Sequence, residues 1–412
     1  MNETTLAVRE LYETFPYPSG TPTIRLGFDA RYLLSLSEQC RPTGGTIRVL
    51  DAGCGRALGL IGAASLQPDV DFLGIDLNRV ALKQAGAQVE ARGLKNVRLV
   101  ESNLEQLEMS DTEFDIIHSS GVIHHLNDPE RALRSLGDRL APHGVLALMV
   151  YGQRDPMQRV AAAVRALTDE AEPLGTRLSV ARQMIMDLSL ADPDNATWKS
   201  AHEVDDVEFV DRYLHPCERF YDIDSLFDLI DASGLEFMSW ADPAAWNPRR
   251  ELTSELLAER LSGQSAIERY KLALSINRPG KLELYLCKPG NRLRQRPVLE
   301  KLDDLPLNVH PEVTLTLEHR GIWCESMIER ISLRLRGAEP LHLNPGPVAS
   351  AAVMLATSSE PFLGRDMVRA LGESGLNREQ ATEVIRDLFE LELIYSPHLV
   401  DIQLPPRAAI AG

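Results

Sequence analysis

The chain has 412 residues, 44% of them apolar, and a formal net charge of −17, a composition typical of globular proteins. No apolar run is long enough to cross a membrane, and the polar N-terminus lacks the pattern of a signal peptide. Five scattered cysteines argue against a disulfide framework or a metal site. We therefore expect a cytoplasmic protein without a membrane partner. Its negative charge makes it a poor candidate for binding the phosphate backbone of a nucleic acid.

Short apolar segments alternate with amphipathic ones from residue 47 to residue 152. Strands are predicted over residues 47–51, 70–76, 97–102, 114–120 and 144–152. Helices are predicted over residues 59–66, 78–92 and 128–142, with Asn78 capping the second and Pro142 closing the third. This alternation predicts an α/β fold with a parallel, doubly wound, Rossmann-like sheet.

The pattern of the chain changes on both sides of this core. The predicted parts are an N-terminal arm or cover (1–46), the core (47–155), a helical lid or substrate insertion (156–270), a pair of strands around the turn NRPG that closes the core sheet (271–290), a linker (291–308) and a small C-terminal domain (309–412). In the last part we expect strands at VTLTLE and ISLRLRG, helices near 347–357, 364–373 and 377–393, and a final strand near 398–404.

The stretch VLDAGCGRALG (49–59) ends the first strand with a carboxylate and two glycines. The dinucleotide-binding pattern G-x-G-x-x-G requires a third glycine where Leu58 stands, and Asp51 would repel a pyrophosphate. A carboxylate suits a ligand that is cationic at that end. S-adenosylmethionine carries an ammonium and a sulfonium and no phosphate, and Gly53 and Gly55 let the backbone approach its methionine part closely.

Further candidate residues follow the next strands. Asp76 ends the second strand and can accept both ribose hydroxyls, with Leu77 beside it. Asn103 follows the third strand, where it can bind the adenine amino group while Leu104 packs on the ring. Ser119 begins SSGVIHHL, whose backbone would pass near the methionine and the reactive methyl group. The alternative is a set of turn glycines and helix caps in an unrelated α/β fold.

With these motifs, residues 47–152 resemble class I S-adenosylmethionine-dependent methyltransferases, over VLDAGCG, GIDLN and FDIIHSSGVIHHLNDPERALRSLGDRLAPHGVLALMVYG. The family usually has a third glycine at position 57; here Ala57 requires a negative φ, which we expect. ETFPYPSG (13–20) and DRYLHPCERFYDIDSLFDLIDASGLEF (211–237) resemble a bacterial group with a methyltransferase regulatory region and a winged-helix-like tail. Some members of that group look like protein lysine methyltransferases.

Methyl transfer depends chiefly on aligning donor and acceptor, and it needs a general base only if the acceptor arrives protonated. Tyr17 lies in an aromatic, proline-rich stretch that either covers the cofactor or packs on the core surface. Tyr213 and His215 lie in RYLHPCERFY, where His215 would act as a base and Glu218 would hold an ammonium. The alternative for that segment is a capped helix start with a surface ion pair.

Other reactive side chains have plainer interpretations. His124 and His125 lack the spacing of a metal site such as HExxH, so we expect them to be structural or to form a wall of the cofactor pocket. We expect His118 and Cys54 to be packed.

Helices followed by a strand at the C-terminus are typical of a winged helix, which can bind DNA. The helix predicted near 377–393 would face phosphate with five acidic side chains, Glu379, Glu383, Asp387, Glu390 and Glu392. Its apolar residues have the spacing of a core face: Ala381, Val384, Ile385, Leu388 and Leu391. We therefore expect a domain that contacts a protein or peptide or forms a homodimer, and no nucleic-acid partner.

Together these features predict an S-adenosylmethionine-dependent methyltransferase that acts on a protein or peptide side chain. One alternative is a small-molecule methyltransferase of natural-product or metabolite chemistry, with residues 156–270 as its lid. Another is a cofactor-binding regulator without catalytic activity, whose tail contacts a partner.

Overall fold

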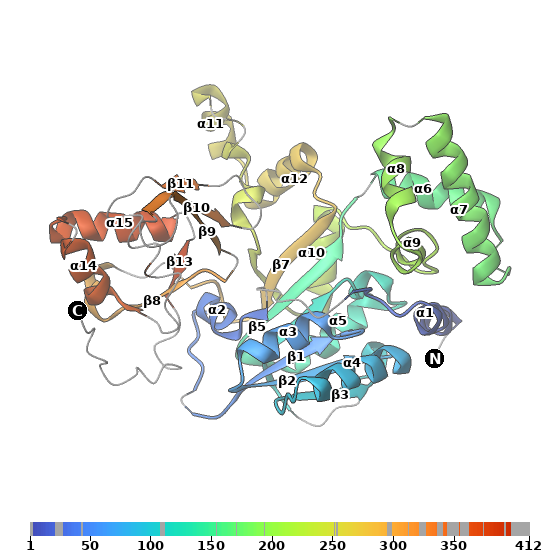
Figure 1. Ribbon diagram of the computed structural model, residues 1–412, viewed down its shortest axis with the longest axis horizontal. Coiled ribbons are helices and arrows are strands. Elements are labelled where there is room, and N and C mark those ends of the chain that lie inside the picture. Colours follow the sequence, from blue (N-terminus) through green and yellow to red (C-terminus); the bar gives the residue numbers. More distant parts are fainter. Residues whose placement is uncertain are drawn as a thin grey trace. The chain divides into compact units, whose positions relative to one another are not determined.

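The chain folds into two compact units in a computed structural model (Figure 1). The first unit comprises Met1–Phe28 with Thr46–Gly290, and the second comprises Asp29–Gly45 with Asn291–Gly412. The structure describes residues 3–20, 28–42, 44–107, 112–153, 155–169, 171–192, 194–250, 252, 254–294, 299–311, 313–320, 327–335, 341–343, 354, 362–373, 375–390 and 393–396. Within these ranges no helix has both the length and the hydrophobicity needed to cross a bilayer.

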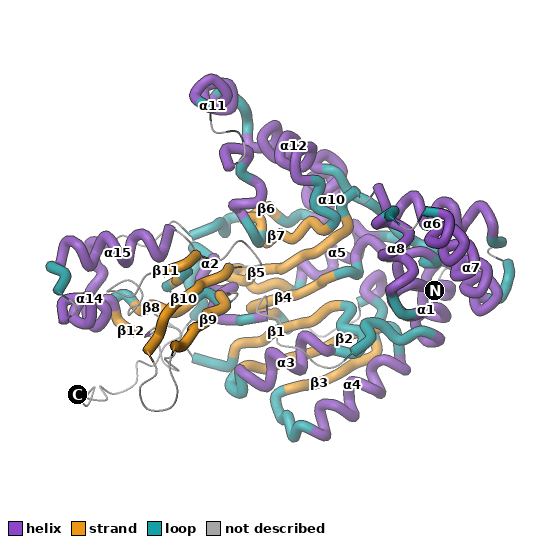
Figure 2. The backbone as a smooth tube through the Cα atoms, turned by 45° about the horizontal axis from the view of Figure 1, so that its top comes forward, coloured by secondary structure: helices purple, strands orange, loops and turns teal. Residues whose placement is uncertain are grey.

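A seven-stranded sheet lies at the centre of the first unit (Figure 2). Its strands, in the spatial order β3-β2-β1-β4-β5-β7-β6, are β3 (Val97–Glu101), β2 (Val70–Asp76), β1 (Ile47–Ala52), β4 (Phe114–Ser120), β5 (Leu140–Tyr151), β7 (Lys281–Cys287) and β6 (Glu236–Trp240). The strands from β3 to β5 are parallel, and β7 runs antiparallel to both of its neighbours. The predicted Rossmann-like α/β fold is confirmed. The strand order reverses between β1 and β4, and in such sheets ligands bind at the carboxyl ends of the strands at this point.

Helices cover both faces of this sheet. The helices of the first unit are α1 (Glu3–Thr14), α3 (Leu58–Leu66), α4 (Arg79–Ala91), α5 (Pro129–Asp138), α6 (Asp155–Leu167), α7 (Leu174–Ala191), α8 (Ala196–Glu203), α9 (Asp206–Tyr213), α10 (Ile223–Ser233), α11 (Glu255–Ser262) and α12 (Ala266–Asn277), with short 3-10 turns η2 (Leu104–Gln106), η3 (Ile123–His125), η4 (Pro243–Trp246) and η5 (Pro248–Arg250). Leu50 and Leu73 share a core cluster with residues of α5, α10 and α12. Their neighbours Val49 and Phe72 point to the other face and are buried as well.

Local capping explains where several core elements begin and end. Asn78 caps α4 as predicted, because its Oδ1 accepts the N–H groups of Val80 and Ala81 at 2.9 and 3.0 Å. The prediction that Pro142 closes the preceding helix is wrong, since α5 ends at Asp138 and β5 already begins at Leu140. Pro142 is tolerated there because the register of β5 against β4 shifts in this region.

Two predicted boundaries after the core are also wrong. The interval 156–270 contains β6, which is an edge strand of the sheet, so the helical insertion is limited to α6–α9. Residues 271–277 are not a strand, because they continue α12. This helix begins with a capping box in which Ser265 and Glu268 bind each other's backbone N–H groups, and β7 alone follows the turn.

The second unit also includes residues that we assigned to the N-terminal arm. In α2 (Ala30–Leu36), the Tyr32 ring contacts His310 at a centroid distance of 4.4 Å. Ser37 Oγ then donates to Asn291 Oδ1 at 3.0 Å. The predicted arm 1–46 is therefore divided between the units. The predicted linker 291–308 likewise contains the 3-10 turn η6 (Leu299–Asp304) and the start of β8 (Pro306–Val309).

The rest of the second unit consists of small sheets and helices. Its further elements are β9 (Val313–Arg320), β10 (Met327–Leu335), β11 (Leu341–Leu343), β12 (Phe362–Leu363), α14 (Gly364–Glu373), α15 (Arg378–Glu390) and β13 (Ile394–Tyr395). The predicted core face of α15 is confirmed by the burial of Ala381, Ile385 and Leu388. Leu391, the final strand near 398–404 and all but residue 354 of the helix near 347–357 lie outside the described residues, and the winged-helix assignment stays a prediction.

Candidate functional site

A pocket opens at the carboxyl ends of β1, β2, β3 and β4, beside the reversal point of the sheet. Its floor is the glycine loop after β1. Gly53 and Gly55 have φ values of +81° and +52°, which favour glycine. A Cβ on Gly53 would lie 2.4 Å from Val122, and one on Gly55 would lie 2.6 Å from the carbonyl oxygen of Tyr17. Both glycines are therefore required by backbone conformation and by space.

Ala57 departs from the sequence-based expectation. Its φ of +52° and ψ of +32° place it in the left-handed region, so the expected negative φ is wrong. Ala57 precedes the first residue of α3, where the loop turns into the helix. A non-glycine residue in this conformation costs about 1–2 kcal/mol. The loop therefore has the left-handed conformation that a glycine at position 57 would adopt easily, and Ala57 bears the strain of that conformation.

Asp76 joins the glycine loop to the end of β2. Its Oδ2 accepts the N–H of Gly55 and its Oδ1 accepts the N–H of Asn78, both at 2.7 Å. Burial raises the pKa of this carboxyl, and the two backbone hydrogen bonds oppose that rise. Each carboxylate oxygen can accept a second hydrogen bond, so Asp76 can still hold a diol from within the pocket.

Asp51 lies at the end of β1 with a histidine beside it. His118 occupies the register position next to Asp51 on β4, and its Nδ1 is 3.4 Å from Asp51 Oδ1. The Phe28 ring packs against that of His118 in a tilted arrangement with a centroid distance of 3.8 Å. All three residues line the pocket, so His118 is a wall residue and not merely a packed one.

The remaining cofactor candidates divide into two groups. Leu77, Leu104 and Asn103 line the pocket, and Asn103 Oδ1 also caps η2 by accepting the N–H of Glu105 at 2.9 Å. Ser119 is fully buried, and its hydroxyl donates to the carbonyl of Ala52 at 3.1 Å. It ties β4 to β1 behind the pocket, whose lining on this strand includes His118 and Ser120.

Glu105 is a pocket residue that sequence reasoning missed. It is buried, and its two oxygens accept the hydroxyl of Thr5 at 2.8 Å and the N–H of Asp128 at 2.7 Å. Its position two residues after Asn103 was the available signal. The contact with Thr5 could not be read from the sequence because 100 residues separate the two side chains.

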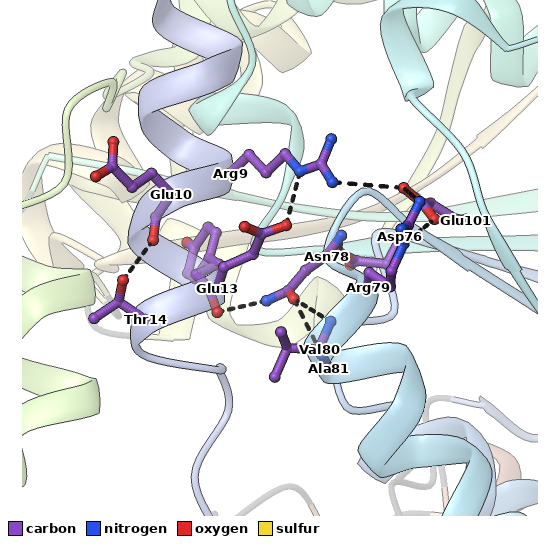
Figure 3. A network of polar contacts seen from close by, with 11 residues as sticks. Arg9, Glu10, Glu13, Thr14, Asp76, Asn78, Arg79, Val80, Ala81 and Glu101 are labelled. Atoms are coloured by element: carbon purple, nitrogen blue, oxygen red, sulfur yellow. Dashed lines mark hydrogen bonds and ion pairs between the residues drawn. The ribbon is translucent and has the colours of Figure 1, made fainter.

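Helix α1 covers the cofactor side of the pocket. The carbonyl of Tyr12 accepts a hydrogen bond from Asn78 Nδ2 at 2.5 Å. Asn78 itself lies beside Asp76 (Figure 3). Arg9 is 2.8 Å from Glu13 and 3.8 Å from Glu101, so its charge is compensated within this cover. The chain continues past α1 to Tyr17, which also lines the pocket. Residues of α1 and of the segment after it thus line the pocket together with the candidate cofactor residues, and a cover over a bound cofactor stays a prediction.

The other end of the pocket is bordered by the helical insertion. Tyr12 donates its hydroxyl to Asp211 Oδ1 at 2.7 Å, which joins α1 to α9. Burial and the neighbouring Asp211 raise the pKa of the Tyr12 hydroxyl well above its ordinary value. Asp211 is buried and lines the pocket. This carboxylate lies two positions before Tyr213 and was not among the predicted site residues.

His215 lies behind this border. Its ring lies against that of His125, with a centroid distance of 3.8 Å, and against that of Tyr12, with a centroid distance of 5.5 Å. His125 and Tyr12 line the pocket. Burial, followed by the proximity of His125, lowers the pKa of His215 well below its usual range. His125 is therefore a pocket wall, in line with one of the two expectations for it.

Tyr213 lies away from the pocket. It packs in the apolar cluster of α6–α9, with its ring 4.9 Å from that of Phe209.

Arg219 donates to the carbonyls of Leu126 and Asn127, so it fixes the segment after His125. Burial, Asp51 and Asp76 raise the pKa of Cys54 well above its ordinary value, which keeps it a thiol. In the described part of the chain, no three His, Cys, Asp or Glu side chains are grouped to hold a metal ion.

Comparison with known proteins agrees with this arrangement. The profile of a family described as a methyltransferase domain matches residues 44–200. An uncharacterized Synechococcus protein, syc1184_c, is 29% identical over 65% of this chain and 68% of its own length. The trans-aconitate 2-methyltransferase of Deinococcus radiodurans is 33% identical over 32% of this chain and 46% of its own length.

Solved structures show the same fold. PKMT2 from Rickettsia typhi matches 93% of this chain and 77% of its own, with a TM-score of 0.67 and 15% identity. Its complex with AdoHcy matches 93% of this chain and 78% of its own, with a TM-score of 0.66 and 16% identity.

Proposed function

Because the chain belongs to the class I S-adenosylmethionine-dependent methyltransferases, we propose that it methylates an amino group of a protein or peptide. The observation that carries this proposal is the charge of the acceptor end of the pocket. Asp211 presents a buried carboxylate there, together with the rings of Tyr12, Tyr17 and Tyr151. Carboxylates and aromatic rings attract a cationic or amine group and repel a carboxylate acceptor.

The cofactor of this class is S-adenosylmethionine, as predicted, and the residues of the pocket fit it. When bound, it supplies an electrophilic methyl group on a sulfonium. Asp51 would face its ammonium, Gly53 and Gly55 would allow its methionine part to approach the backbone, and Asp76 would hold the ribose. Leu77, Asn103 and Leu104 would surround the adenine.

The placement of the cations that line the pocket does not favour an acidic methyl acceptor. The guanidinium of Arg9 is held near two glutamates, and Lys281 is exposed where β7 begins. Malonyl-[acyl-carrier protein] O-methyltransferase of Bacillus anthracis is 27% identical over 30% of this chain. This relative and the trans-aconitate enzyme are named for a carrier-bound and a small-molecule acceptor. Such an acceptor is therefore our second candidate for the substrate. Both alignments cover only about a third of this chain.

The protein acceptor is supported by the resemblance of the flanking motifs to the protein-lysine-methyltransferase-like group. It is also supported by the likeness to PKMT2, which extends over 93% of this chain. We propose that the second unit contacts the protein substrate, in keeping with the acidic residues of α15.

The test is transfer of a labelled methyl group from S-adenosylmethionine into a cell-protein extract and, separately, into a metabolite extract. The label is located by mass spectrometry. We expect label on amino groups of proteins with the wild-type chain and a large loss of label with Asp76→Asn. Label in the metabolite extract alone would favour the small-molecule candidate. Cofactor binding without transfer to either extract would favour the regulator.

A further inference from the structure

The backbone of one residue, Cys217, determines where two neighbouring histidine rings at the acceptor end of the pocket carry their hydrogen atoms. Its carbonyl oxygen lies 2.9 Å from His125 Nδ1, and its N–H donates to His215 Nδ1 at 3.1 Å. The two rings lie against each other in a tilted arrangement, with a centroid distance of 3.8 Å and an interplanar angle of 31°. The Cys217 segment is itself fixed on η3, because the N–H of Arg219 donates to the carbonyl of His124 at 3.0 Å.

These contacts determine the tautomer of each ring. A carbonyl can only accept, so His125 carries its hydrogen on Nδ1 and keeps a lone pair on Nε2. A backbone N–H can only donate, so the neutral ring of His215 carries its hydrogen on Nε2. His125 lines the pocket, and no described residue binds its Nε2. The pocket wall therefore offers a hydrogen-bond acceptor with a fixed direction.

Both rings stay neutral in this environment. Burial lowers the pKa of His125 to about 4, and burial with the neighbouring His125 lowers that of His215. The rings of His124, Tyr151 and His215 and the residue Cys217 contact His125, and the buried Tyr12 hydroxyl lies beyond His215. The nearby cation is Arg219, whose guanidinium lies 3.5 Å from Cys217 Sγ and donates to the carbonyls of Leu126 and Asn127. At neutral pH none of the rings in contact with His125 carries a positive charge that would compete with an amine for the Nε2 lone pair.

We propose that His125 is a catalytic residue whose Nε2 accepts a hydrogen bond from the acceptor N–H and so orients the nitrogen lone pair towards the methyl group. The inference rests on the proposed function, because it requires an amine acceptor. A neutral histidine suits this task, since a protonated one would repel an ammonium and would have no lone pair to offer. His215 and the backbone of Cys217 act as positioning groups that hold the ring and its tautomer.

Two variants of His125 separate this role from a structural one. His125→Gln can keep an acceptor oxygen near the position of Nε2 while it loses the bond to Cys217. His125→Asn can keep the bond to Cys217 while it loses the reach to the acceptor. We expect His125→Gln to retain most of kcat and His125→Asn to lose about 10- to 100-fold, the effect of one positioned hydrogen bond. Cofactor affinity, measured by calorimetry, should be unchanged in both.

Nitrogen-15 NMR of the histidine-labelled full chain supplies a readout that does not depend on activity. At neutral pH we expect the hydrogen of His125 on Nδ1 and that of His215 on Nε2. Addition of n-butylamine, with S-adenosylhomocysteine present, should shift the His125 Nε2 resonance. A His125 ring with its hydrogen on Nε2, or a kcat for His125→Asn equal to or above that of His125→Gln, would overturn the proposal.

The same experiments distinguish failure of the inference from failure of the proposed function. If the wild type methylates only small amines, the protein acceptor is wrong, and the two variants compared on that amine still decide the role of His125. If it methylates only carboxylates, both proposals fail. If the wild type methylates none of these acceptors, the NMR measurement of the two tautomers and of the shift caused by n-butylamine decides whether His125 has the proposed role.

Discussion

Ala57 is the residue where this chain bears a backbone conformation that its side chain disfavours. Its φ of +52° is close to that of Gly55, two positions earlier in the loop. We expect Ala57→Gly to raise the free energy of unfolding by about 1 kcal/mol, because glycine removes the left-handed strain at a smaller entropic cost. Urea denaturation followed by circular dichroism measures this change.

The matched control is Ala87→Gly, which makes the same substitution at an exposed site inside α4. There glycine should lower the free energy of unfolding by about 1 kcal/mol, since the backbone is already helical. Two variants that destabilise the chain equally would mean that Ala57 is not strained.

Asp76 supports both the loop and the proposed ribose contact. In Asp76→Asn the side chain has one oxygen in place of two, so it can accept the backbone N–H of only one of Gly55 and Asn78. Its NH₂ group must then face the N–H of the other residue, and two donors oppose each other. We expect the affinity for S-adenosylmethionine to fall by about 1–3 kcal/mol, as measured by calorimetric titration. Asp71→Asn, exposed on the same strand, should leave the affinity unchanged. An Asp76→Asn chain that binds as tightly as the wild type would refute the ribose assignment.

The residues of the pocket differed in how far the sequence revealed them. Asp51, Gly53, Gly55 and Asp76 could be found because each lies at the carboxyl end of a strand or in the loop directly after it. The contacts of Asp211 and Glu105 could not be predicted, because their partners Tyr12 and Thr5 lie 199 and 100 residues away in the sequence. The sign of φ at Ala57 was also beyond sequence reasoning, since either sign allows the chain to enter α3.

At the scale of elements, α1 is attached to the core by a few polar contacts. One of them is the hydroxyl of Thr5 on the buried carboxylate of Glu105. Thr5→Val keeps the shape of the side chain and removes this donor. We expect it to weaken cofactor binding and to lower the free energy of unfolding by about 1–3 kcal/mol, because a buried carboxylate loses a partner. Calorimetry and thermal denaturation test the two effects.

Thr4→Val is the control for this variant, since it changes the neighbouring position of the same helix, which is less buried. Equal effects of the two substitutions would show that helix propensity, and not the bond to Glu105, holds the cover.

Elements with strong local signals were predicted well. Strands β1 to β4 and the cap of α4 follow from apolar runs and from Asn78. The second half of α12, residues 271–277, was mistaken for a strand because its apolar residues lie before a turn and a true strand. The Ser265–Glu268 capping box was the signal that could have corrected the assignment. The shift of register that accommodates Pro142 in β5 depends on pairing with β4, which local sequence does not contain.

At the scale of the whole molecule, the buried histidines predict how stability depends on pH. The pKa of His125 is lowered to about 4 and that of His215 is lowered well below 6.5. The unfolded chain takes up protons near pH 6.5, where the folded chain does not, so the stabilisation is complete above pH 6.5 and is lost as the pH falls towards 4. Thermal denaturation between pH 7 and pH 4 should show this loss.

His125→Gln should have a smaller loss of stability over that pH range, because one of the two suppressed protonations is removed. A loss as steep as that of the wild type would mean that other groups, such as buried carboxylates, govern the acid sensitivity.

The division of the whole molecule into units could be predicted only in part. Composition changes indicated a C-terminal domain, and α14 and α15 were placed correctly. The membership of residues 29–45 depends on contacts such as Ser37 with Asn291, 254 positions apart, and no local pattern indicates such a pairing.

The most direct test of this account is calorimetric titration of the full chain with S-adenosylmethionine, with NAD as the comparison ligand. The carboxylates of Asp51 and Asp76 at the ends of β1 and β2 should admit the cationic, phosphate-free ligand and repel a pyrophosphate. We expect S-adenosylmethionine to bind with micromolar affinity and NAD not to bind. Binding of NAD alone, or of neither ligand, would contradict the assignment of this pocket and of every residue proposed to act in it.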